Sequence, residues 1–159
     1  MLAAGLLLGI GLGGFVDGIV LHQVLQWHHM LTSEGSHPAT TVAGLEANTL
    51  GDGLFHAFAW LAVCVGLWLL WRESRTAPFG FQGRRLIGLM LAGWGLFNLA
   101  EGLVDHHLLG IHHVKLDGDG DAIVALDVAF LAAGAFLLVV GSAIARSSGV
   151  YPVQGRATE

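Results

Sequence analysis

Histidines are unusually frequent in this chain, which has nine of them beside only seven Lys and Arg and twelve Asp and Glu residues. Imidazole nitrogens and carboxylate oxygens bind Zn, Cu, Fe and Mn ions, and both groups can also transfer protons. The pattern therefore predicts a transition-metal site, with a buried polar network or a proton relay as alternatives. Two blocks of sequence carry the same order of groups, namely Asp17, His22, His28 and His29, and then Glu101, His106, His112 and His113.

Further acids and a histidine accompany these two blocks. Asp52 and His56 are four residues apart, so on a helix both side chains could reach one ion. Asp105 precedes His106, and Asp127 enters the last apolar stretch. The two carboxylates expected nearest to the middle of the membrane, Asp17 and Glu101, are the candidate catalytic groups that would move protons. The candidate metal ligands are His22, His28, His29, Asp52, His56, Asp105, His106, His112, His113 and Asp127.

An uninterrupted helix would bring the ligands of each block together. At about 100° per residue, Asp17 and His28 fall within about 20° of each other, and His22 and His29 form a neighbouring stripe. Glu101 and the histidines after it would repeat this arrangement. This expectation requires the first helix to continue to the histidine pair.

Four apolar stretches must position these groups, at 2–27, 50–71, 86–109 and 123–145. Each is close to the roughly 20 residues that a helix needs to cross a bilayer. The composition agrees, because 54% of the residues are hydrophobic and the mean hydropathy is +0.67. We expect an all-α bundle of four transmembrane helices forming a single membrane domain over 1–159, and a water-soluble enzyme is excluded.

An internal repeat becomes visible when residues 2–30 are laid on residues 86–114, with 11 of 29 positions identical. The second and fourth stretches match more weakly at a shift of 75. The repeat units are 2–72 and 86–146, followed by a tail at 147–159. Two similar hairpins of the same orientation predict a pseudo-twofold axis along the membrane normal, between the first and third helices. Gly5, Gly9 and Gly13 form a row that favours close helix packing.

The positions of the basic residues predict the orientation. Six of the seven basic residues lie between the second and third apolar stretches or after the fourth, and only Lys115 lies in another loop. The six are Arg72, Arg75, Arg84, Arg85, Arg146 and Arg156. The positive-inside rule therefore places both termini in the cytoplasm and the histidine-rich loops outside. The net charge of −5 argues against a nucleic-acid partner. The lipid bilayer is the expected partner, and the glycine and tryptophan content is compatible with a homodimer or a membrane partner protein.

The chain resembles an uncharacterised bacterial family of small four-helix membrane proteins, a domain of unknown function. The motifs that carry the resemblance are VDGIVLHQVLQWHHM at 16–30, GDGLFH at 51–56 and EGLVDHHLLGIHHV at 101–114. The resemblance implies a multi-pass protein of the bacterial inner membrane, and it implies no activity.

The leading functional hypothesis is a membrane metalloprotein with one or more Zn, Cu or Fe ions in the outer half of the bilayer. Its chemistry would be of oxidase or hydrolase type if the site is catalytic. One alternative is an electron carrier in which His22 and His106 bind a b-type haem, although haem would not explain the buried acids. The other is a carrier of metal or protons that supplies a partner enzyme.

Overall fold

The computed structural model describes residues 1–33, 35–76, 82–116 and 118–148, and throughout that part the regular elements are helices. Four segments are long and apolar enough to cross a membrane, which confirms the predicted all-α architecture with four spans. Residues 149–159, with Arg156 and most of the predicted tail, lie outside the described part. The elements in chain order are α1 (Leu2–Val16), η1 (Asp17–Val24), α2 (Val42–Thr76), α3 (Gly83–Glu101), η2 (Gly102–Leu108) and α4 (Gly120–Ser147).

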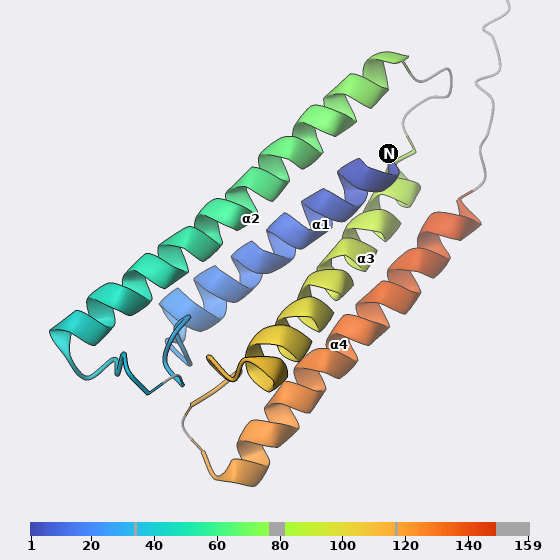
Figure 1. Ribbon diagram of the computed structural model, residues 1–159. Coiled ribbons are helices and arrows are strands. Elements are labelled where there is room, and N and C mark those ends of the chain that lie inside the picture. The colour runs from blue at the N-terminus through green and yellow to red at the C-terminus, as the bar shows by residue number, and fades with distance from the viewer. Residues whose placement is uncertain (34, 77–81, 117, 149–159) are drawn as a thin grey trace, which may run out of the picture.

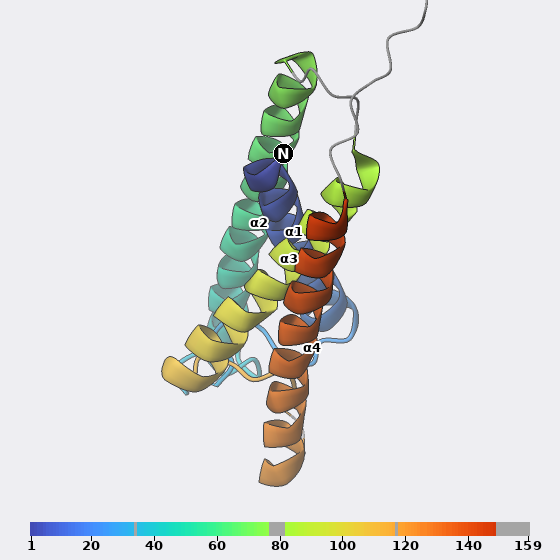
Figure 2. The ribbon, with the colours of Figure 1, turned by 90° about the vertical axis from the view of Figure 1, so that its right-hand side faces the viewer.

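The helices stand in the order α2, α1, α3, α4, so α1 and α3 are central and the other two flank them (Figures 1 and 2). Half of the spanning residues of α1 and α3 are buried, while α2 and α4 are mostly exposed. The N-terminus and the end of α4 lie at one end of the bundle (Figure 1). The loops with the HH pairs lie at the other end, which we call the histidine end.

Glycines let the two central helices approach backbone to backbone. A Cβ atom on Gly9 would overlap the carbonyl group of Met90, and one on Gly93 would overlap the carbonyl group of Leu6. Membrane helices associate through such close packing because lipid provides no hydrophobic drive between them. The two flanking helices also pack closely against the central ones at glycines. These are Gly11 and Gly66 in the contact with α2, and Gly88, Gly95, Gly134 and Gly141 in the contact with α4.

The second helix is longer than predicted, because it begins at Val42 and not near residue 50. Its first two turns are held by Asn48, which is 1% exposed. The Asn48 side-chain nitrogen donates to the carbonyl groups of His37 and Gly44, both at 2.9 Å, and its Oδ1 accepts from the Leu31 amide at 2.8 Å. The apolar stretch at 50–71 therefore covers only part of this helix. The additional turns before it are held by the hydrogen bonds of Asn48.

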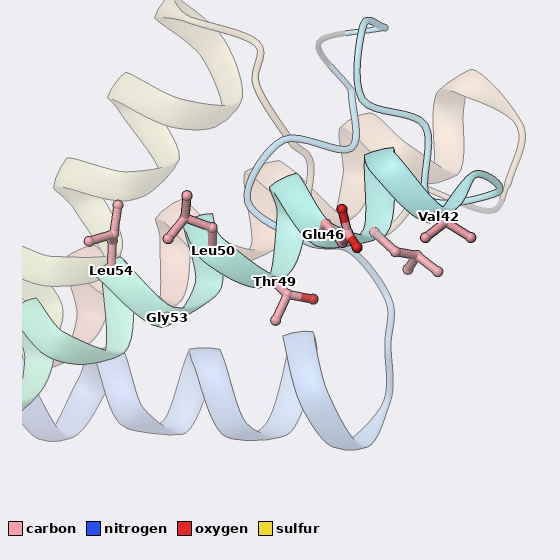
Figure 3. A pocket seen from close by; sticks show the side chains of 7 residues that line it. Val42, Glu46, Thr49, Leu50, Gly53 and Leu54 are labelled. Carbon is pink, nitrogen blue, oxygen red and sulfur yellow. The ribbon is translucent and has the colours of Figure 1, made fainter.

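The half of α2 nearest to the histidine end turns an apolar face away from the other helices. A pocket of about 610 Å³ lies along this face between Val42 and Leu54, with Glu46 and Thr49 among its lining residues (Figure 3). Leu50 and Leu54 are 65% and 64% exposed. Such a surface suits lipid chains, as expected for a flanking helix of a membrane bundle.

The first and third helices both widen into a π-helix and then reverse direction. The Leu25 amide donates to the Val20 carbonyl at 2.8 Å, and the Leu109 amide donates to the Val104 carbonyl at 2.7 Å. Each bond spans five residues, where an α-helix spans four. The predicted continuation of the helix to residue 27 and on to the histidine pair is therefore wrong.

Both reversals use a residue with a left-handed backbone conformation. Gln26 has φ of 51°, and Gly110, its equivalent in the repeat, has φ of 60°. Glycine adopts this conformation at no steric cost, whereas glutamine does so against its preference. Apolar periodicity carries no signal for such a residue, which explains the error in the predicted helix end.

Candidate metal centre

Four imidazole rings meet at the histidine end, and we call them the imidazole cluster. His22 lies on η1 and His106 on η2, while His28 and His112 follow the two chain reversals. The four side chains are between 0% and 4% exposed. His28 and His112 stack with centroids 4.7 Å apart and an interplanar angle of 5°, and His22 and His106 pack edge-on against them at 4.3 and 4.9 Å.

Two buried carboxylates border the imidazole cluster where the α-helices become π-helices. Asp17 is 4% exposed and Glu101 is 5% exposed. Asp17 Oδ2 lies 3.1 Å from His22 Nε2, and Glu101 Oε1 lies 3.5 Å from His112 Nε2. Three sets of ligand atoms lie within 4.8 Å of one another, namely His22, His28 and His112, then Glu101, His106 and His112, and finally Asp17, His22 and Glu101.

A third carboxylate, Asp52 of α2, contacts the histidines of the first repeat unit. Its Oδ1 lies 2.8 Å from His22 Nδ1 and accepts from the Met30 amide at 3.0 Å. Its Oδ2 lies 2.8 Å from His29 Nδ1. Asp52 is only 2% exposed, so these contacts replace the water that the carboxylate would otherwise bind.

Asp127 of α4 makes the corresponding contacts in the second half. Its Oδ1 lies 3.2 Å from His106 Nδ1 and accepts from the Val114 amide at 3.0 Å. Its Oδ2 lies 2.6 Å from His113 Nδ1. The partners match at the same shifts, 84 and 75, that align the sequence. The pseudo-twofold axis stays a prediction, but the repeated contacts are those it would require.

The two loops at the histidine end are joined to each other across the bundle. His28 Nδ1 donates to the carbonyl of Val114 at 2.9 Å. The Ser33 amide donates to the Ile111 carbonyl at 2.9 Å. Burial, with the nearby His22 as a further cause, lowers the pKa of His28 to about 4. Such a histidine is neutral at pH 7, which is the form that binds metal ions.

The outer contacts determine which nitrogen faces inward. A carbonyl oxygen only accepts hydrogen bonds, so Nδ1 of His28 carries the proton and its Nε2 keeps the lone pair. His22 instead has a carboxylate oxygen beside each ring nitrogen, Asp52 Oδ1 at Nδ1 and Asp17 Oδ2 at Nε2. Nε2 of His28 and Oε2 of Glu101 are buried without a hydrogen-bond partner. Buried polar atoms without partners are costly, and one or more metal ions would satisfy all of them.

The remaining predicted ligands lie outside these close sets. His29 contacts Asp52, and His113 contacts Asp127. His56 Nδ1 donates to the main-chain carbonyl of Asp52 at 2.7 Å, and its ring faces Phe15 and Phe55, so the structure does not bring the Asp52 and His56 side chains to one point. Asp105 is half-buried and belongs to none of the three sets.

One buried polar residue near the site was missed in the sequence. Asn98 of α3 is 6% exposed, and its Oδ1 has no hydrogen-bond partner. The available signal was an amide in the middle of an apolar stretch, three residues before Glu101. Such an amide is costly in a membrane and therefore suggests a role.

Comparison with known proteins places the chain among membrane proteins. A family described as predicted membrane protein (DUF2243) matches residues 4–148, and the function of that family is unknown. No curated protein and no solved structure matches. The match agrees with the family resemblance of the histidine motifs and with the four membrane-spanning helices.

Proposed function

We propose that this chain, which belongs to the DUF2243 family of membrane proteins, is an integral membrane metalloprotein. The ligands are the imidazole cluster, formed by His22, His28, His106 and His112, and the carboxylates of Asp17 and Glu101. The observation that carries this proposal is the convergence of these six buried side chains, whose ligand atoms form three sets that each lie within 4.8 Å.

The outer contacts of the cluster support a metal more than a polar network. Histidines that bind metals commonly donate their second ring nitrogen to a carboxylate or a main-chain carbonyl. Asp52 and the Val114 carbonyl hold His22 and His28 in this way. The 3.1 Å contact between Asp17 Oδ2 and His22 Nε2 is one that a network without metal would also make, so the outer contacts carry the distinction.

The donor set suits Zn, Cu or Fe, because imidazole and carboxylate together favour such ions over Ca and Mg. Any two of the three close sets have one residue in common, which is His22, His112 or Glu101, so two neighbouring ions could share ligands as in carboxylate-bridged bundle sites. Ions of this kind activate water or dioxygen, and Asp17 or Glu101 would move the proton when not bound to metal. This is the oxidase or hydrolase type of chemistry.

The packing of the rings favours metal ions over the haem alternative. A haem between His22 and His106 would need an open slot for its macrocycle. In the structure His28 and His112 stack between these two residues. The carrier alternative gains no comparable support, because residues 2–14 and 86–97 contain no ionisable side chain that would extend a path to the opposite end.

The proposal places the site in the outer half of a bacterial inner membrane. Arg72, Arg75, Arg84 and Arg146 lie at the end of the bundle opposite to the histidines. Basic residues mark the cytoplasmic side, so both termini face the cytoplasm and the site faces outward.

Metal content tests the proposal directly. The chain purified in detergent without chelators should contain at least one equivalent of Zn, Cu or Fe by plasma mass spectrometry. Dialysis against EDTA should remove the metal and lower the melting temperature, because a ligand at 100 times its Kd stabilises the folded state by about 2.7 kcal/mol. A metal-free protein whose melting is unaffected by EDTA would contradict the proposal, and a Soret band would favour haem.

The supporting carboxylates give a graded test. Asp52→Asn combined with Asp127→Asn should weaken metal binding by about 10- to 100-fold, because each amide is uncharged and keeps only one acceptor oxygen for the two histidines that the carboxylate holds. Competition with a chromophoric chelator measures this. Asp119→Asn is the matched control. Asp119 accepts a hydrogen bond from the Ala122 amide at the start of α4, and this bond involves no residue of the cluster. Equal affinity in both proteins would mean that the outer carboxylates do not position ligands.

A further inference from the structure

A small pocket opens beside the metal site on the lipid-facing side of the central helices. Its volume is about 120 Å³, and it lies between α1, η1, α3 and α4. Val16 and Val20 line it and are 43% and 39% exposed, so they form its rim toward the bilayer. Asp17 and Asn98 are the polar residues of a lining that is otherwise apolar.

The sequence repeat is broken at this pocket. Gly13 lines the pocket, and its equivalent in the second half is Phe97. Phe97 is 7% exposed, and its ring lies 5.9 Å from that of Phe55. A phenylalanine ring therefore fills, beside Glu101, the position that is left open beside Asp17.

The second break in the repeat supplies a polar group. Asn98 stands where the first half has Gly14. Asn98 Oδ1 is buried without a hydrogen-bond partner, whereas Asp17 Oδ2 lies 3.1 Å from His22 Nε2. An unsatisfied buried acceptor costs about 1–3 kcal/mol, which a ligand with an O–H or N–H donor would offset. The repeated frame does not require this amide, so its presence is specific to the pocket.

The size and lining restrict the ligand. A water molecule occupies roughly 30 Å³ of liquid, so the pocket has room for about four heavy atoms. Apolar walls open to lipid exclude a charged molecule, because ions are costly at this depth. The unpaired Asn98 Oδ1 favours a molecule that carries a hydroxyl group over a hydrocarbon of the same size.

We infer that this pocket binds a small uncharged hydroxyl compound of the short-alcohol class, which enters from the bilayer between Val16 and Val20. The compound donates a hydrogen bond to Asn98 and lies against Asp17, at the edge of the metal site. This inference rests on the proposed function, since Asp17 is one of the proposed ligands.

Crystals of the full chain soaked with 2-bromoethanol test the inference through the anomalous signal of bromine. We expect a bromine peak in the pocket, with an occupancy about threefold or more above that of bromoethane at equal concentration, because only the alcohol can donate a hydrogen bond. Val20→Phe should remove the peak by filling the rim. Val104→Phe is the matched control, because Val104 is the equivalent residue of the second half and is 42% exposed. Asn98→Leu should abolish the preference for the alcohol.

Metal analysis of the same crystals separates the two proposals. Bound metal without bromine in the pocket would overturn this inference and leave the metal site intact. Bromine in a chain that never binds metal would overturn the proposed function. Equal occupancy of the two probes, or an unchanged preference in Asn98→Leu, would overturn the hydrogen bond to Asn98. Loss of the peak in Val104→Phe as well as in Val20→Phe would overturn the entry route.

Discussion

Replacing His22 and His106 together by alanine is expected to reduce the metal content of the purified protein from at least one equivalent to about a tenth of that or less. Both residues face the centre of the imidazole cluster, and each belongs to a close set of ligand atoms. A site that loses two of its nitrogen ligands keeps too few donors for tight binding. Plasma mass spectrometry after gel filtration measures the effect.

The matched control removes two other histidines, His56 and His107. His107 is exposed, and its Nδ1 donates to the Gly102 carbonyl at 2.7 Å. His56 contacts a carbonyl and aromatic rings. The control variant should keep the wild-type metal content. Equal loss in both variants would mean that metal binding follows total histidine content, and an unchanged content in His22→Ala/His106→Ala would remove the cluster from consideration.

Adding one methyl group to each central helix, by Gly9→Ala with Gly93→Ala, is expected to destabilise the bundle by about 1–3 kcal/mol for each substitution. Each Cβ atom would overlap a main-chain carbonyl of the facing helix, and a backbone cannot move aside as a side chain can. The helices must then separate, which also pulls His22 away from His106. Thermal unfolding in detergent, together with metal content, measures both consequences.

Gly53→Ala is the matched control and should have the opposite sign. Gly53 lies on the outer face of α2, where an added Cβ atom meets nothing within 4 Å. Alanine is more favourable than glycine within a helix by roughly 0.5–1 kcal/mol, so this variant should be neutral or slightly stabilised. Destabilisation of the same size in all these variants would contradict the role of close packing at Gly9 and Gly93.

The contacts of the two halves explain how a simple repeat can build an unequal site. Asp52 and Asp127 hold their histidines in the same way, so the frame of the site follows the repeat. Two of the departures lie together at the pocket, where Gly13 corresponds to Phe97 and Gly14 corresponds to Asn98. Matching contacts hold the buried histidines in both halves, and these two departures leave a pocket beside Asp17.

The sequence by itself determined the helical class, the four spans, the repeat and the residue types of the buried cluster. Lipid leaves an apolar segment of this length no alternative to a helix, and ionisable groups are costly enough there to stand out in the sequence. The convergence of the two histidine blocks at one end of the bundle also followed from matching depths.

Only the tertiary structure decided how these groups meet. The helix that was expected to carry His28 ends before it, because a π-helix and a left-handed residue at Gln26 turn the chain back. His28 therefore reaches His112 through a loop held by the Val114 carbonyl, and not along a helical stripe. Contacts between residues distant in sequence determine which nitrogen points inward and where a pocket remains, and no local pattern encodes such contacts.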